Sequence, residues 1–153
     1  MAFRHEVSSE IEIAATADEV WDVLADFATY REWNPGFSRI EGEPVAGTRL
    51  SITFTPKGRR AMTMRPTLLA VEPGRELRWL GHLFVPGLFD GEHRFEIHVI
   101  EPGRVRFVQG ERFRGLLVPF LRKMLEVDTL AMFRAVNDAL ARRVVQVRAQ
   151  TAA

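Results

Sequence analysis

The 153-residue chain contains no cysteine. Disulfide frameworks, thiolate zinc sites and cysteine nucleophiles are therefore excluded. The chain also has almost no excess of charge, because 21 basic residues stand against 20 acidic ones and the net charge is +1 with neutral histidines. Such a balance creates no overall field that would attract nucleic acid or an anionic membrane. We expect no nucleic-acid partner.

Long hydrophobic runs are missing as well. No stretch approaches the ~18 consecutive apolar residues of a membrane-spanning helix, and the N-terminal segment carries charges where a signal peptide would be apolar. We expect a cytoplasmic protein without a membrane span. Histidine pairs one helical turn apart, acidic clusters and glycine-rich phosphate loops are also missing, so the sequence predicts neither a metal site nor a cofactor.

The composition is that of an ordinary folded domain, with 46% hydrophobic and 27% charged residues. Polar and apolar residues alternate from Val7 to Ile13, which predicts a half-buried strand. Thr16 followed by Glu19 is a capping-box motif and predicts the start of a helix. A second short helix is expected over residues 27–33.

The middle of the chain, residues 37–114, alternates with the period of strands between turn signals. Glu-Pro-Gly occurs at 72–74 and at 101–103, and each copy predicts a tight hairpin with a left-handed glycine. After Gly115 the period changes to that of a helix of about 30 residues. The pattern predicts an α+β fold with a seven-stranded antiparallel sheet, two short helices after the first strand and a long C-terminal helix.

The two short helices carry a family motif. The segments Val20-Trp21-Asp22-Val23-Leu24-Ala25-Asp26 and Tyr30-Arg31-Glu32-Trp33-Asn34-Pro35 resemble the start of the polyketide cyclase/dehydrase and START-like group in the SRPBCC superfamily. The resemblance implies a helix-grip fold, in which the sheet wraps around the C-terminal helix. We expect one such ligand-binding domain over residues 1–149 and a loose tail over residues 150–153.

The expected arrangement of sheet and helix predicts a cavity. One helix of about 10 Å diameter cannot fill the trough of a strongly twisted sheet unless the inward side chains are bulky. A partly hollow apolar core binds a small hydrophobic ligand. The side chains expected around that ligand are mostly aromatic, with three methionines and one amide: Trp33, Phe37, Phe54, Met62, Met64, Trp79, Phe84, Phe89, Phe95, Phe107, Gln109, Phe113, Phe120, Met124 and Phe133.

The expected loop over residues 82–91 is unusually apolar, with five large hydrophobic residues among ten. Loops are normally polar, so this segment predicts a lid over a pocket, a packed surface loop or a contact between two copies of the chain. The superfamily resemblance implies a pocket opening here. A monomer and a homodimer both remain open.

The last hairpin brings two titratable residues together. If it is centred on Pro102, His93 lies opposite Glu111 on the inward face, with Gln109 one step further in. A carboxylate beside an imidazole is a workable acid–base unit, in which His93 would move the proton and Glu111 would orient the ring. The alternatives are a purely structural pair and a polar contact for a ligand.

Three functions follow from these features. The first is a binder or carrier of a small hydrophobic ligand, of lipid, aromatic or polyketide type, which needs only an apolar pocket. The second is a polyketide cyclase/dehydratase-type enzyme, in which His93 and Glu111 would be catalytic. The third is an interaction module similar to the chaperone-activator branch of the superfamily, which needs an exposed patch for its partner.

Overall fold

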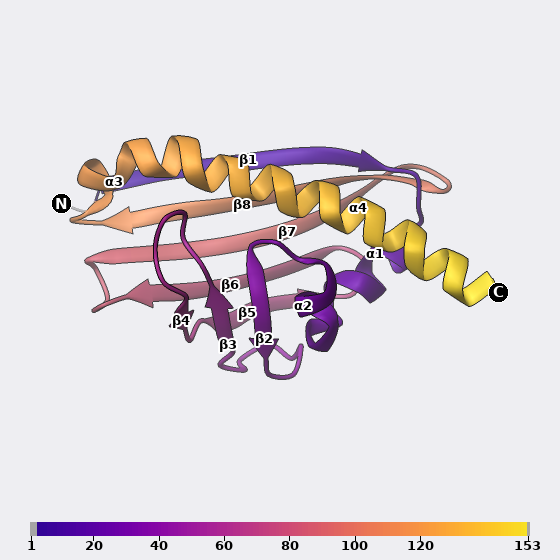
Figure 1. The fold of residues 1–153 in the computed structure, drawn as a ribbon, viewed down its shortest axis with the longest axis horizontal. Coiled ribbons are helices and arrows are strands. Elements are labelled where there is room, and N and C mark those ends of the chain that lie inside the picture. Colours follow the sequence, from indigo (N-terminus) through magenta and orange to yellow (C-terminus); the bar gives the residue numbers. More distant parts are fainter. Residues whose placement is uncertain (1–2, 153) are drawn as a thin grey trace.

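The computed structural model of the protein describes residues 3–152. Its largest element is a five-stranded antiparallel sheet in the order β1-β8-β7-β6-β5 (Figure 1). In β1 the predicted alternation is confirmed, because Val7 and Ile13 are buried whereas the glutamates between them are exposed. The strands of this sheet are β1 (Phe3–Ile13), β5 (Thr67–Glu72), β6 (Glu76–Leu83), β7 (Phe89–Glu101) and β8 (Arg104–Gly115).

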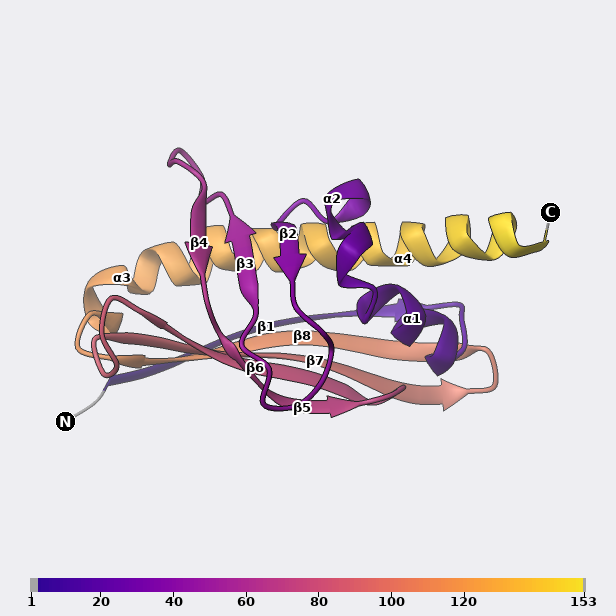
Figure 2. The same ribbon diagram turned by 90° about the horizontal axis from the view of Figure 1, so that it is seen from below.

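A second sheet holds three strands, β2 (Phe37–Glu41), β3 (Ser51–Phe54) and β4 (Met62–Met64). The expected single sheet of seven strands is therefore wrong. Pro66 lies between β4 and β5 and has no N–H to donate, so it divides what the alternation suggested was one run of strand. Beyond an isolated bridge between Arg49 and Thr67, the chain leaves the large sheet, and the small sheet rises from the β5 edge (Figure 2).

The helices are α1 (Ala17–Leu24), η1 (Phe27–Thr29), α2 (Tyr30–Trp33), α3 (Val118–Met124), η2 (Leu125–Thr129) and α4 (Leu130–Ala152). The last three form one rod, with Pro119 in its first turn as predicted and a π-helical segment at η2. Residues 150–152 of the expected tail continue α4, and residue 153 lies outside the described residues. No helix within residues 3–152 combines the length and apolar character needed to cross a bilayer.

Local sequence signals position these elements as predicted. The Thr16 hydroxyl accepts from the Glu19 amide at 3.2 Å, and the Glu19 carboxylate accepts from the Thr16 amide at 3.0 Å, which completes the capping box. Both Glu-Pro-Gly turns place glycine in the left-handed region, with φ of 75° at Gly74 and 78° at Gly103. The hairpin that contains Gly103 pairs His93 with Glu111, which is the predicted register.

The helix α4 and the small sheet lie side by side on one face of the large sheet (Figure 2). Between these layers the buried apolar side chains form two clusters. The main cluster contains, among others, Leu24, Ile52, Trp79, Phe107 and Leu140. The second cluster lies at the end of the sheet covered by α3 and η2, and consists of Val7, Phe113, Val118, Leu125 and Phe133.

Candidate functional site

The inward face of β8 changes character along its length. Phe107 belongs to the main apolar cluster and Phe113 to the second one. Between them Gln109 is fully buried, and the side chain of Glu111 is 15% exposed. Two polar residues therefore separate the two apolar clusters on the inner face of this strand.

These residues form a hydrogen-bonded polar line that crosses from the sheet to α4. Nδ1 of His93 lies 3.3 Å from Oε2 of Glu111, and Nε2 of His93 lies 3.1 Å from Oε1 of Gln109. Nε2 of Gln109 donates to Oδ1 of Asn137 at 2.8 Å and to the carbonyl oxygen of Phe133 at 3.3 Å. His93, Gln109 and Asn137 are buried.

The partners of Gln109 determine where the protons lie. A backbone carbonyl can only accept, so the amide nitrogen of Gln109 faces Phe133 and its oxygen faces His93. Nε2 of His93 therefore carries a hydrogen. The other ring nitrogen lies 3.3 Å from Oε2 of Glu111, within hydrogen-bond distance of that carboxyl group. The polar line therefore ends on the partly exposed carboxyl group of Glu111.

Four aromatic rings surround the imidazole. Trp79 stacks on it with a centroid separation of 5.1 Å and an interplanar angle of 18°. Phe37, Phe95 and Phe133 lie at 5.4, 4.6 and 5.1 Å. With both nitrogens engaged and both faces covered, His93 offers no atom to a ligand in this conformation. Glu111 is the member of the line that a ligand can reach.

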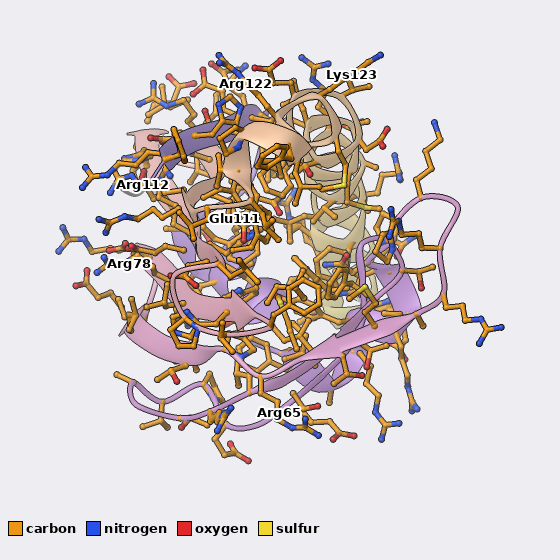
Figure 3. The ribbon with its side chains drawn as sticks, turned by 90° about the vertical axis from the view of Figure 1, so that its left-hand side faces the viewer. Arg65, Arg78, Glu111, Arg112, Arg122 and Lys123 are labelled. Atoms are coloured by element: carbon orange, nitrogen blue, oxygen red, sulfur yellow. The ribbon has the colours of Figure 1, made fainter. Side chains whose placement is uncertain are left out.

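Gly91 makes room for that carboxylate. It lies on β7 next to the His93–Glu111 pair, opposite Phe113, and a Cβ at this position would collide with Oε1 of Glu111. In the view of Figure 3, Glu111 lies near the centre and the labelled basic residues Arg65, Arg78, Arg112, Arg122 and Lys123 lie around the periphery. The carboxylate thus lies toward the interior, beside Gly91 at the start of β7.

The β6–β7 loop is shorter than expected. β6 extends to Leu83 and β7 begins at Phe89, because His82 pairs with Asp90 in the ladder. Nδ1 of His82 also lies 2.8 Å from Oδ1 of Asp90, whose two carboxylate oxygens accept from the amide of Gly87. The loop is therefore residues 84–88.

The remaining residues of the expected ligand site fall into three groups. Trp79, Phe95, Phe107, Phe113 and Phe133 are buried and pack in the two clusters. Phe84 and Phe120 are exposed and line no interior wall in this structure. Phe120 lies on the solvent side of α3, because Val118 and Leu125 define the inner face of that helix. The third group is half-buried: Trp33, Phe37, Phe54, Met62, Met64, Phe89 and Met124.

Two hollows of the described residues are lined by none of the expected ligand-binding residues. One, of about 260 Å³, lies between β1 and α4 and includes Asn137 in its lining. Another, of about 230 Å³, lies beside the rim of the large sheet and is lined by Leu80, Arg112 and Arg114 among others. Phe95 packs against both Trp79 and Phe107 where the open space was expected.

Sequence reasoning missed two residues of this site, Asn137 and Gly91. Asn137 lies four residues after Phe133 and three before Leu140, on the apolar stripe of the helix. A polar residue at such a position was the available signal. No comparable signal marks Gly91, because the collision that it avoids depends on the rotamer of Glu111. Among residues 3–152, no group of three or more His, Asp or Glu side chains is arranged to hold a metal ion.

The fold and sequence have known counterparts. Residues 4–145 match the family described as polyketide cyclase/dehydrase and lipid transport. A comparison with curated protein sequences gave no match.

Three solved structures illustrate the similarity of fold. A point mutant of norcoclaurine synthase from Thalictrum flavum, in complex with a transition-state analogue, is 17% identical with a TM-score of 0.75, covering 97% of this chain and 98% of that one. An aromatase/cyclase from a Streptomyces species is 20% identical with a TM-score of 0.74, covering 94% and 95%. A START superfamily protein from Mycobacterium smegmatis is 20% identical with a TM-score of 0.73, covering 94% and 99%.

Proposed function

Because the chain belongs to the polyketide cyclase/dehydrase and lipid transport family, we propose that it binds a small hydrophobic ligand beside Glu111. The observation that carries the proposal is the polar line from Asn137 to Glu111 between two apolar clusters. Buried polar groups make a core less stable than well-packed apolar residues of the same size would. A line of buried polar groups that ends on a partly exposed carboxylate is better suited to recognising a ligand than to stabilising the core.

The chemistry of the line defines the ligand. An ionised carboxylate only accepts hydrogen bonds, so the polar group of the ligand that meets Glu111 is a hydroxyl or another donor. The remainder of the ligand is apolar, in keeping with the half-buried side chains of Phe89, Met124, Phe54 and Met64. Flexible methionine side chains adapt to an irregular ligand. Binding requires the small sheet or the 84–88 loop to move outward, since the interior is closed in this conformation.

A thermal-shift experiment tests this proposal. Fatty acids, flavonoids and aromatic polyketides are added to the purified protein, and a ligand at 100 times its Kd is expected to add about 2.7 kcal/mol of stability, which corresponds to several degrees. Glu111→Gln is expected to weaken the shift of hydroxyl-bearing ligands. Glu10→Gln, an exposed carboxylate on the other face of the sheet, is the matched control. No shift with any class would contradict ligand binding and favour the interaction module.

The contact between His93 and Glu111 favours a second candidate function, the cyclase/dehydratase type of enzyme. In such a reaction Glu111 would take a proton from the carbon next to a ligand carbonyl and return it to a hydroxyl that leaves as water. His93 would then be a positioning residue that stabilises the charge on Glu111. This reverses the roles expected from the sequence, in which His93 moves the proton and Glu111 orients the ring. The reversal rests on accessibility, because Glu111 is partly exposed and His93 is enclosed.

Two substitutions distinguish an enzyme from a carrier. If the protein is an enzyme, Glu111→Gln lowers turnover about 100-fold or more, because general acid–base catalysis typically contributes 10²–10⁴. His93→Gln retains a polar side chain and is expected to shift the pH profile of the remaining activity rather than KM. If the protein is only a carrier, both substitutions change affinity and no turnover is detected with any ligand that binds.

A further inference from the structure

We propose that the end of the molecule formed by the 84–88 loop and α3 docks on an anionic membrane surface. Four large apolar side chains project there: Phe84 is 72% exposed, Val85 61%, Leu116 55% and Phe120 83%. Isolated exposed apolar residues need no explanation, but a contiguous group marks an interaction site. We refer to these four residues as the apolar patch.

Backbone hydrogen bonds hold the patch together. The amide of Leu116 donates to the carbonyl of Gly87 at 3.2 Å, and the amide of Leu117 donates to the carbonyl of Leu88 at 3.0 Å. These bonds tie the loop that carries Phe84 to the segment that leads into α3 and Phe120. Both segments lie at the same end of the molecule (Figure 1). The patch is therefore one surface with a defined arrangement.

The backbone at Phe84 shows that its exposure is built into the fold. Its φ is +70°. Among residues 3–152, Phe84 is the only residue other than glycine that has a positive φ. A bulky side chain in this region is strained, and such strain persists where the surrounding structure requires it. Glycine would make the same turn without strain. An aromatic residue at a strained, exposed turn is expected of a surface that binds.

Cations flank the patch. Arg114 precedes Leu116 by two residues, and Lys123 follows Phe120 by three. Within the described part of the chain, neither has a carboxylate at salt-bridge distance, and both are exposed. The nearby carboxylates have other partners, since Asp90 binds His82 and Gly87 while Glu126 binds Arg122. Among the described residues, Arg114 and Lys123 thus place two positive charges without an ion-pair partner beside the patch.

This combination selects an anionic bilayer over a second copy of the chain. Aromatic and aliphatic side chains enter the boundary between headgroups and acyl chains, and unpaired cations beside them attract anionic lipids. In a two-fold dimer through the same patch, Arg114 and Lys123 of the two copies would approach each other and repel. The patch also lies at the end of the molecule where Glu111 is accessible, so docking would bring that end to the lipid.

Vesicle sedimentation without any added ligand tests the proposal, so its outcome is independent of ligand binding beside Glu111. The protein is expected to bind vesicles of phosphatidylcholine mixed with phosphatidylglycerol and to bind phosphatidylcholine alone much more weakly. Phe84→Ser and Phe120→Ser should each weaken binding about tenfold, the effect of withdrawing one phenylalanine from an apolar phase. Lys123→Gln should weaken it about fivefold.

The matched control is Val99→Ser, because Val99 is 66% exposed on β7 near the opposite end of the sheet. It should leave vesicle binding unchanged. Equal losses from Val99→Ser and Phe120→Ser, or no binding to the mixed vesicles by the folded protein, would overturn the proposal. So would a dimer in sedimentation equilibrium that Phe120→Ser dissociates, since the patch would then be an interface between copies.

Discussion

The two ends of the large sheet differ in how closely they follow the local rules of chain conformation. At the hairpin end, the capping box of Thr16 and Glu19 and the left-handed glycines Gly74 and Gly103 each satisfy a local rule of chain conformation. At the opposite end, Phe84 adopts a strained backbone, η2 interrupts the α-helix, and His93 is buried with its polar partners. Proteins tend to violate such rules at functional sites. The comparison is in keeping with the proposal that one end contributes stability and the other binds a partner.

The largest effect should come from the main apolar cluster. Phe107→Ala is expected to lower the free energy of unfolding by about 3–5 kcal/mol, because it leaves a cavity among buried aromatic rings. Phe120→Ala, at the opposite end, should change it by less than about 0.5 kcal/mol. Urea unfolding of both variants measures the contrast. Comparable losses would mean that Phe120 packs in solution and that the two ends do not differ in this way.

The next effect concerns the boundary between the two ends. Gln109→Ala leaves Nε2 of His93 and Oδ1 of Asn137 without their partner, and should cost about 2–3 kcal/mol. Nitrogen NMR of His93 gives a second readout, since Nε2 is expected to be protonated in the wild type and free to lose its hydrogen in the variant. An unchanged tautomer would show that Gln109 does not orient the ring.

A smaller effect is expected at the hairpin end. Hydrogen bonds from the Arg148 side chain and the Thr16 backbone lower the pKa of Glu19 from 4.5 to about 2. A lowered pKa stabilises the fold above pH 4.5, and this contribution is lost as the pH falls toward 2. Since the pair is partly exposed, Glu19→Gln should cost about 1 kcal/mol or less at neutral pH. The difference from wild type should shrink in acid unfolding curves, whereas Glu10→Gln should show none.

The smallest effect should have the opposite sign. Phe84→Gly relieves the positive φ and is expected to raise the free energy of unfolding by about 0.5 kcal/mol, after the greater freedom of glycine in the unfolded chain is included. Phe84→Ala keeps the strain and serves as the control. Thermal or urea unfolding measures both. A loss of stability in Phe84→Gly would show that the ring contributes to packing despite its exposure.

The sequence predicted the elements that depend on local rules. The register of the last hairpin followed from one Pro-Gly turn and the period of a strand, and it placed His93 opposite Glu111. The division into two sheets could not be derived in this way. Pro66 indicated an edge or a bulge, but whether the chain continues in the same sheet depends on what the edge of β5 meets in three dimensions.

The errors at the site have a common cause. Hydrophobicity indicates that a side chain gains by leaving water, but it does not distinguish a core from an exposed docking surface. Phe84 and Phe120 were therefore included among the residues expected around the ligand. The roles of His93 and Glu111 depend on which of them is enclosed, and four aromatic rings from distant parts of the chain decide that.

The π-helical segment at η2 behaves as a helix with one surplus residue. Such segments correspond to a single insertion in an α-helix, and one residue turns the chain by about 100° around the helix axis. The wide turn absorbs this residue, so the helix before and after it keeps its faces, and deleting Val127 would restore a continuous α-helix with Phe120 still on the solvent side. The wide turn thus lets this end of the protein carry one more residue while its aromatic ring stays exposed.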